Sequence, residues 1–421
     1  MSDIVIERIR AREIINGRGI PTVEVEVTTN RGICATASAP GGVSKAAHEA
    51  IELRDGGSRY MGMGVATAVG NIHDRIAPHL AGRIVTEQQE IDRTLIELDG
   101  TPNKSNLGGN ALTAVSLAVA KAAALSLNLP VYRYLGGIKA CSIPVMCPNM
   151  LSGSSTAGND LDFEDYLLVP HGFPGIREAI RAGVEVFHTL HGMLTARFGL
   201  IPQITALAPP LQTNEEALNL LVEAIAKAGY GGKIGIGIDV ASGLLYDETR
   251  GVYRLKQGEM TRDELIAYYV ELTRNYPILF WEDGLYEEDF EGFSLLTQKV
   301  STLVVGDDLF ATNKERLLRG ARGGSANAIL FKVNQAGTVS EALETAETAK
   351  NCGYAIVSSV RSRETDDPVQ ADLAVAVGAK LMKVGCPLRG EMVTKYNRLM
   401  KIEEDLGGHG HFRGTEFQRE A

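Results

Sequence analysis

The chain has 421 residues, of which 44% are hydrophobic and 22% charged, and its formal net charge at pH 7 is −10. This composition is typical of a folded globular protein and excludes a disordered or fibrous one, and the negative charge disfavours a nucleic-acid partner. No apolar run reaches the roughly 20 residues of a membrane span, and the five cysteines have no Cys-x-x-Cys spacing, so we expect a cytoplasmic protein with free thiols.

The N-terminal part of the chain predicts a small α+β domain. Apolar and polar residues alternate strictly in "PTVEVEVTT" (21–29), and this stretch is flanked by two further strand patterns at 4–14 and 32–39, so an antiparallel meander is expected. Helical patterns follow at 64–80 and in the alanine-rich stretch 110–129. Glycines and a proline in "YLGGIKACSIP" then indicate a boundary, which places this domain at residues 1–138 and a second domain at 139–421.

The second domain shows a repeated pattern of apolar strands that end in a polar residue. Between these strand ends, which recur about every 25 residues in the last part of the chain, lie helical stretches. A strand followed by a helix, repeated in this way, predicts a parallel β/α barrel, and the C-terminal strand ends of such a barrel meet at one mouth. The polar residues expected to meet there are Asp239, Glu282, Asp307, Lys332, Ser359 and Lys383.

Three carboxylates at one barrel mouth predict a metal site. Each of them could instead cap a helix or face solvent, but together they would repel one another without a hard cation, and carboxylates with open water positions suit Mg²⁺. A desolvated lysine beside a second lysine has a lowered pKa and can serve as a base, which gives Lys332 a possible role.

Long motifs in the chain resemble enolase. They run from "REIINGRGIPTVEVEV" through "NALTAVSLAVAKAAA", "FWEDGLYEEDFEGF", "VVGDDLFATN" and "ILFKVNQAGT" to "KYNRLMKIEEDLG". The resemblance implies an enolase-type (β/α)8 barrel that is atypical in its first strands, a smaller N-terminal α+β domain that acts as a lid, a homodimer or higher homo-oligomer, Mg²⁺, and a small phosphorylated carboxylate as substrate. The use of a lysine base with Mg²⁺ is a general property of that superfamily.

The resemblance also implies roles for individual residues. Asp239, Glu282 and Asp307 match the metal ligands, Lys332 matches the base that removes the proton next to the substrate carboxylate, and Lys383 matches a residue that binds that carboxylate. Asp165 stands where the family has a catalytic glutamate. The residues expected to bind the rest of the substrate are Arg361 and Ser362 at the phosphate, with Ser44, Lys45 and Arg363 nearby.

The chain also departs from the family pattern at several positions. Gly41 and Lys45 replace the first serine and the threonine of the lid loop, and Thr156 and Val360 stand where the family has histidines. No Asp or Glu occurs between Glu185 and Glu215, where the family carries the acidic segment that helps hydroxide to leave. General-acid assistance is worth about 10²–10⁴ in rate, so these losses predict a poor dehydratase.

Three hypotheses about function follow. The leading one is an enzyme like the carboxyphosphonoenolpyruvate synthase of phosphonate antibiotic pathways, with Lys45 and Arg363 binding a second, phosphonate co-substrate; the alternative for both side chains is a solvent-facing position. The second hypothesis is phosphopyruvate hydratase, which converts 2-phosphoglycerate to phosphoenolpyruvate. The third is a non-catalytic binding protein, and the presence of both lysines and all three carboxylates counts against it.

Overall fold

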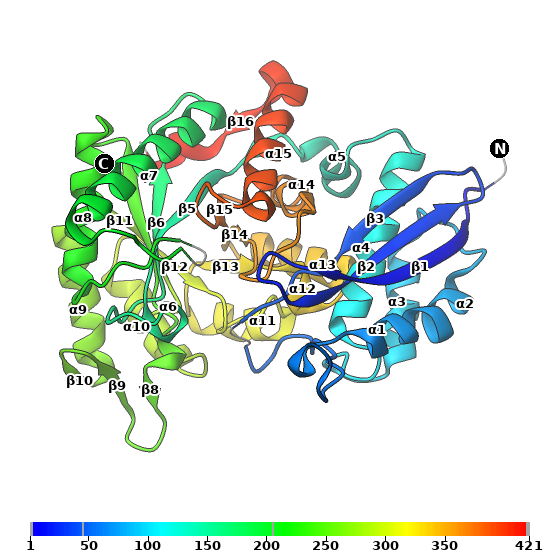
Figure 1. Ribbon diagram of the computed structural model, residues 1–421, viewed down its shortest axis with the longest axis horizontal. Helices are drawn as coiled ribbons and strands as arrows, with labels where there is room; N and C mark the ends of the chain where they lie inside the picture. The colour runs from blue at the N-terminus through cyan, green and yellow to red at the C-terminus, as the bar shows by residue number, and fades with distance from the viewer. Residues whose placement is uncertain (1–2, 44–45, 204–205, 418–421) are drawn as a thin grey trace.

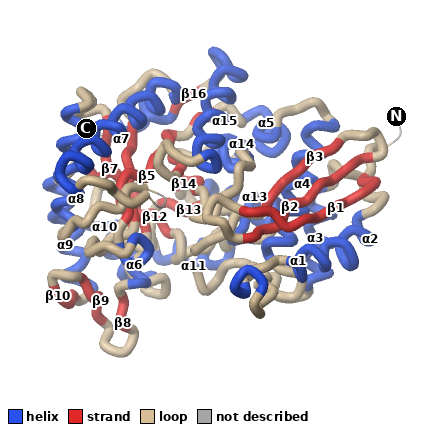
Figure 2. The backbone as a smooth tube through the Cα atoms, viewed as in Figure 1, coloured by secondary structure: helices blue, strands red, loops and turns tan. Residues whose placement is uncertain are grey.

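The computed structural model describes residues 3–43, 46–203 and 206–417, without the side chains of residues 155 and 156. Two bodies lie side by side (Figure 1): a sheet with helices formed by the N-terminal part, and a closed barrel of eight strands formed by the rest. Figure 2 shows the barrel strands gathered inside a ring of helices. The predicted fold class, an α/β barrel with a smaller α+β domain, is confirmed; the exact boundary at residue 138 stays a prediction.

The N-terminal sheet has the predicted meander order β1-β2-β3 and is antiparallel throughout. Its strands are β1 (Ile6–Ile15), β2 (Pro21–Thr29) and β3 (Cys34–Ser38). Val23, Val25 and Val27 of β2 are fully buried while the glutamates between them are partly exposed, because successive side chains of a strand point to opposite faces. One face of the sheet therefore packs against helices.

Helix α4 (Gly109–Ser126) forms the core of this domain, where it packs on β2 and β3. It is long and apolar enough to cross a membrane, but 83% of it is buried inside the protein, as in the core helix of a folded domain. The other helical segments of this part are α1 (Ala66–Asn71), α2 (Ala77–Leu80), α3 (Gln88–Asp99), α5 (Val131–Gly136), the π-helix η2 (Ile72–Ile76) and the 3₁₀ turns η1 (Arg59–Gly62) and η3 (Gly137–Lys139).

The barrel closes in the order β5-β6-β7-β11-β12-β13-β14-β15. The predicted strand ends lie in its strands, or directly after them, as expected. The strands are β5 (Val145–Ser152), β6 (Asp165–Pro170), β7 (Ile234–Asp239), β11 (Ile278–Glu282), β12 (Leu303–Gly306), β13 (Ala328–Phe331), β14 (Ala355–Ser359) and β15 (Leu381–Val384).

One strand departs from the parallel barrel that the spacing predicted. β6 runs antiparallel to both of its neighbours, β5 and β7, in line with the atypical first strands that the resemblance implied. The segment between β5 and β6 contains only α6 (Ser154–Ala157), and this one-turn helix does not provide the helical crossover by which parallel strands are usually joined. Two long helices, α7 and α8, then connect β6 to β7.

Helices surround the barrel, and two small sheets lie outside it. The sheet β10-β9-β8 projects from one end of the molecule (Figure 1). The barrel helices are α7 (Ile176–Phe198), α8 (Asn214–Lys227), α9 (Arg262–Asn275), α10 (Phe290–Lys299), α11 (Lys314–Gly323), α12 (Val333–Ala336), α13 (Val339–Asn351), α14 (Val369–Ala376) and α15 (Gly390–Leu406). The outer segments are η4 (Ser242–Leu244), β8 (Tyr246–Asp247), β9 (Val252–Leu255), β10 (Gly258–Met260), β4 (Ser142–Ile143), η5 (Gly407–His409), β16 (His411–Phe412) and η6 (Arg413–Phe417).

The two domains are joined by hydrogen bonds at the mouth of the barrel. Gly17 N–H donates to the carbonyl oxygen of Glu364 (2.8 Å), and Gly41 and Arg363 exchange backbone hydrogen bonds of 3.1 and 2.9 Å. The Ala50 N–H donates to the carbonyl oxygen of Gln335 (2.8 Å). The N-terminal domain therefore covers the end of the barrel at which the predicted polar residues lie.

Candidate functional site

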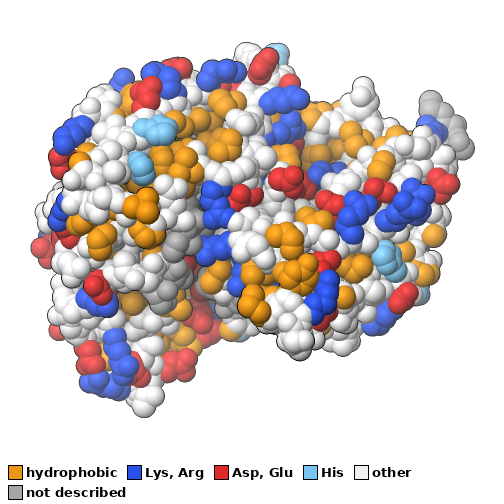
Figure 3. Space-filling model, viewed as in Figure 1, with side chains coloured by type: hydrophobic (Ala, Val, Ile, Leu, Met, Phe, Trp, Pro, Cys, Tyr) orange, Lys and Arg blue, Asp and Glu red, His pale blue; other side chains and the backbone are white. Residues whose placement is uncertain are grey.

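A cavity of about 290 Å³ lies at the C-terminal ends of the barrel strands. The strand-end side chains that the sequence placed there come together in it, except Glu282, which is buried beside the cavity and does not line it. They meet because the strands that carry them are neighbours in the closed barrel. On the face seen in Figure 3, a furrow flanked by basic side chains runs between the two domains. The predicted residues that line the cavity are Asp165, Asp239, Asp307, Lys332, Ser359, Arg361, Ser362 and Lys383.

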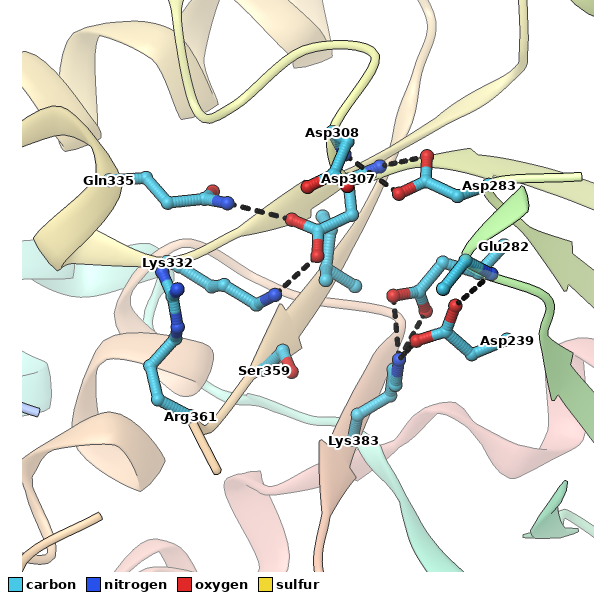
Figure 4. Close-up of polar contacts among 12 residues, drawn as sticks. Asp239, Glu282, Asp283, Asp307, Asp308, Lys332, Gln335, Ser359, Arg361 and Lys383 are labelled. Carbon is cyan, nitrogen blue, oxygen red and sulfur yellow. Dashed lines mark hydrogen bonds and ion pairs between the residues drawn. The ribbon is translucent and has the colours of Figure 1, made fainter. Parts of the chain in front are cut away.

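Lys383 lies between two of the predicted metal ligands (Figure 4). Its Nζ donates to Asp239 Oδ2 (2.8 Å) and to Glu282 Oε1 (2.6 Å). Burial would lower the pKa of Lys383, but these two carboxylates raise it well above its usual value. Burial and the charge of Asp239 in turn raise the pKa of Glu282 well above the usual range, since Glu282 is wholly inaccessible to solvent behind the lysine.

Asp307 forms the second centre of charge in the cavity. Its carboxylate accepts hydrogen bonds from Lys332 Nζ and from Gln335 Nε2, the latter at 2.8 Å (Figure 4). Burial alone would raise the pKa of Asp307, but the charge and hydrogen bond of Lys332 lower it. The neighbouring Asp283 accepts the backbone N–H groups of Asp307 (2.9 Å) and Asp308 (2.8 Å), and this fixes the direction in which the Asp307 side chain points.

The carboxylates of the cavity fit a divalent metal ion. Glu282 Oε2 is buried and lies 2.6 Å from the Lys383 ammonium, so this carboxylate oxygen already faces a cation. Oxygen donors of this kind suit Mg²⁺. The acidic side chains that lie within 4.8 Å of one another are, however, Asp283, Asp307 and Asp308; the predicted ligands Asp239 and Glu282 instead surround Lys383.

Within this acidic group, Asp307 is the best candidate for a ligand. Both oxygens of Asp283 already accept backbone N–H groups, so Asp283 orders the strand end and does not need a cation. Burial and the charge of Asp307 raise the pKa of Asp308 to about 7. Lys332 and Lys383 neutralise the carboxylates that they contact. A bound divalent ion would have to replace the two lysines as the counterion of these carboxylates.

Two further carboxyls line the cavity next to Asp239. Asp165, the first residue of β6, is paired with Asp239 of β7 across the antiparallel ladder, and its Oδ1 accepts hydrogen bonds from Asn149 Nδ2 and Ser152 Oγ. Burial raises the pKa of Asp165 to about 6. Burial, followed by the charges of Asp239 and Asp165, raises the pKa of Glu164 to about 8, so this pair retains a proton near neutral pH.

Arg361 and Ser362 lie where the N-terminal domain meets the cavity. Arg361 is buried and donates to Glu49 Oε2 (2.7 Å); burial lowers its pKa, but the charge of Glu49 raises it by more. The Oγ of Ser362 accepts the Val43 N–H (3.0 Å). Both residues thus contact the loop that follows β3.

The other predicted substrate-binding residues are not placed in the cavity. Arg363 does not belong to its lining, because its backbone is bridged to Gly41 and the charges that act most on its guanidinium are those of Glu52 and Arg54. A role for Arg363 in substrate binding stays a prediction. Ser44 and Lys45 lie outside the described residues.

Two of the cavity residues that were not predicted from the sequence matter for the chemistry of the site. Glu164 lines the cavity beside Asp165. Because it precedes β6, the alternation of side chains along a strand did not predict that it faces the cavity. Arg18 reaches the cavity from the turn between β1 and β2. The sequence offered one signal for Arg18, its position in the tight turn "NGRGIP". The strands on either side of this turn carry acidic residues that can pair with the other arginines.

Comparisons with known proteins agree with this architecture. Residues 140–421 match the family "Enolase, C-terminal TIM barrel domain", and residues 6–135 match "Enolase, N-terminal domain". The enolase of Methanopyrus kandleri is 49% identical to this chain over 415 residues, and the match covers 97% of each protein.

Two further relatives are similar over almost their whole length. The enolase of Pyrococcus furiosus is 48% identical over 417 residues, with 97% of each chain covered. The enolase of Methanocaldococcus jannaschii is 47% identical over 406 residues, with 96% covered. Both domain matches and all three relatives indicate the same assignment. The chain belongs to the enolase family, and it is an enzyme of the enolase superfamily.

Proposed function

We propose that the protein is a phosphopyruvate hydratase, which removes water from 2-phosphoglycerate to give phosphoenolpyruvate in the presence of Mg²⁺. The observation that carries the proposal is the arrangement of Lys332 and Lys383, each bound to a buried carboxylate in one cavity. Such an arrangement suits a reaction that builds up negative charge on a substrate carboxylate. Relatives named enolase, at 46–49% identity over nearly the full chain, support the same activity.

The leading hypothesis from the sequence, a carboxyphosphonoenolpyruvate synthase, is wrong. Full-length identity of 46–49% to enolases overturns it, and the sequence argument gave too much weight to a few departures in loops. The phosphonate co-substrate and the link to antibiotic biosynthesis are given up with it. Arg363 lies outside the cavity lining, which removes one of the two side chains assigned to that co-substrate. The non-catalytic hypothesis fails as well, since the chain is an enzyme.

The substrate would lie between the two lysines and the N-terminal domain. Lys383 would bind the carboxylate of 2-phosphoglycerate, and Arg361 with Ser362 would bind its phosphate. Lys332, in its neutral form, would remove the proton from C2, so the electron pair of that C–H bond moves onto the carboxylate. Loss of the hydroxyl group from C3 then forms the double bond of phosphoenolpyruvate. Charge on the carboxylate is what makes the first step difficult, and a preorganised cation there lowers its barrier.

Hydroxide leaves C3 more easily when it receives a proton. We assign that proton to the pair of Glu164 and Asp165, because they line the cavity and their pKa values are raised to about 8 and about 6. Their charges are coupled, so the proton belongs to the pair and not to one side chain. This pair would replace the acidic segment that the chain lacks between Glu185 and Glu215.

We propose that Asp239, Glu282 and Asp307 would hold Mg²⁺. When bound, the ion would neutralise these carboxylates and draw negative charge away from the substrate carboxylate. A cytoplasmic location stays a prediction from the sequence, and a homodimer or higher homo-oligomer stays a prediction from the resemblance. Light scattering of the purified protein would measure the oligomeric state.

Turnover of 2-phosphoglycerate tests the proposal. Purified protein with Mg²⁺ should form phosphoenolpyruvate, followed by ³¹P NMR, and Lys332→Ala should lower the rate by about 10²–10⁴, the contribution of a general base. Asp165→Asn and Glu164→Gln should each lower the rate by about 10² or more, because either change weakens the proton donor.

The matched control is Lys299→Ala, at the exposed end of α10, which should turn over at the wild-type rate. The proposal is rejected when the wild-type protein, with Mg²⁺ in excess, forms no phosphoenolpyruvate, or when Lys332→Ala is as active as Lys299→Ala.

A further inference from the structure

The turn between β1 and β2 is held rigidly against the mouth of the barrel. The side-chain oxygen of Asn16 accepts the N–H groups of Arg18 (3.0 Å) and Ile20 (3.1 Å). Gly17 packs so closely on Glu391 that a Cβ at this position would lie 2.2 Å from the Glu391 carboxylate, and its N–H bonds to the carbonyl oxygen of Glu364. The turn therefore has a defined position, and Arg18 at its tip has a defined direction.

Arg18 extends from this turn into the cavity. It belongs to the cavity lining together with Arg361 and Ser362, and its Nε donates to the carbonyl oxygen of Ser362 (3.1 Å). That single bond fixes the guanidinium next to the expected phosphate position. The two terminal nitrogens have no hydrogen-bond partner and no ion pair in the part of the chain that the structure describes.

Arg18 forms no ion pair with a carboxylate in the part of the chain that the structure describes, whereas other arginines do. Arg12, on the same hairpin, pairs with Glu24 (2.7 Å), and Arg361 pairs with Glu49 (2.7 Å). Burial, followed by the charges of Arg389 and Arg363, lowers the pKa of Arg18, and the smaller opposing effects of Asp165 and Glu164 do not reverse this shift. A half-buried guanidinium beside two other arginines is electrostatically unfavourable unless an anion joins it.

We propose that Arg18 is a further phosphate-binding residue, whose terminal nitrogens bind the phosphate of the substrate beside Arg361 and Ser362. The proposal rests on the proposed function, which supplies a phosphorylated carboxylate as ligand. Guanidinium presents two parallel N–H donors that match two oxygens of a phosphate. Because Arg18 belongs to the N-terminal domain and Arg361 to the barrel, the bound phosphate would also hold the two domains together.

Binding of phosphoenolpyruvate, measured by titration calorimetry with Mg²⁺ in excess, tests the role of Arg18. Arg18→Gln should weaken binding at least tenfold, which corresponds to about 1.4 kcal/mol. Arg18→Lys should give an intermediate affinity, since an ammonium keeps the charge but not the paired donors. Inorganic phosphate should compete with phosphoenolpyruvate on the wild-type protein and compete less well on Arg18→Gln.

The matched control is Arg10→Gln, an exposed arginine of β1 on the same hairpin, which should bind phosphoenolpyruvate with wild-type affinity. If Arg18→Gln does not fold, Arg18→Met retains the aliphatic part of the side chain and takes its place. Wild-type affinity in a folded Arg18→Gln or Arg18→Met overturns the proposal. A wild-type protein that binds phosphoenolpyruvate but does not convert 2-phosphoglycerate would instead contradict the proposed function and leave the assignment of Arg18 standing.

Discussion

The charge, the hydrogen bonds and the position of Asp307 all support its proposed role as a metal ligand. It follows β12, it accepts hydrogen bonds from Lys332 and Gln335, and the backbone beside it is held by Asp283. Its lowered pKa means that it is ionised when no metal is bound, so it is ready to accept a cation. The other two proposed ligands share Lys383 and would need that lysine to turn toward the substrate.

We therefore expect Asp307→Asn to reduce the affinity for Mg²⁺ by at least tenfold, about 1.4 kcal/mol, because an amide is a weaker ligand for a hard cation. Titration calorimetry of the substrate-free protein would measure the change. Asp263→Asn, at an exposed aspartate at the start of α9, is the control and should bind Mg²⁺ normally. Equal affinities in the two variants would remove Asp307 from the metal site.

At this scale the sequence predicted the polar residues at the regular strand ends of the barrel and missed residues that the spacing does not place, such as Glu164 and Arg18. Strand ends of a barrel must converge, so Asp239, Asp307 and Lys332 could be placed from spacing alone. Arg18 could not be, because its position depends on how the hairpin docks on the barrel, and this is decided by contacts such as that between Gly17 and Glu391.

The glycines of β7 show how the barrel interior is filled. A Cβ at Gly237 would lie 2.0 Å from Cε1 of the Phe280 ring on the neighbouring strand β11. Phe280 is fully buried, so the ring cannot move into solvent to make room. Position 237 must therefore be a glycine, so that the Phe280 ring can pack against the strands that carry Asp239 and Glu282.

Gly237→Ala should lower the free energy of unfolding by about 1–3 kcal/mol, as overpacking of a filled core usually does. Urea denaturation followed by circular dichroism would measure it. Gly231→Ala, in the loop before β7 where a Cβ meets nothing within 4 Å, should change stability by less than about 0.5 kcal/mol. If the two substitutions have equal effects, Phe280 does not pack as described.

Element type was predictable where the pattern was long and regular. Strict alternation over 21–29 gave β2, and the repeat of strand and helix gave the barrel from β7 onward. The direction of β6 could not be read from the repeat, because it depends on the length and content of the connection with α6 and not on the strand itself. The resemblance to enolase implied only that the first strands of the barrel are atypical.

The whole molecule is a barrel whose mouth is covered by a second domain, and its chemistry depends on both. Lys332, Lys383 and the three carboxylates come from the barrel, whereas Arg18 and Glu49 come from the N-terminal domain. The missing motifs did not decide between a phosphopyruvate hydratase and a carboxyphosphonoenolpyruvate synthase. A chain that lacks an acid in one loop can carry another acid, such as Glu164, elsewhere in the cavity.

The most direct test of the account is the reverse reaction in heavy water. With phosphoenolpyruvate and Mg²⁺, the protein should add water across the double bond, and NMR should detect 2-phosphoglycerate with deuterium at C2, delivered by Lys332. Lys332→Ala should form no such product, while Lys299→Ala should form it at the wild-type rate. Absence of product from the wild-type protein, or deuterium at C2 at an undiminished rate in Lys332→Ala, would contradict the account.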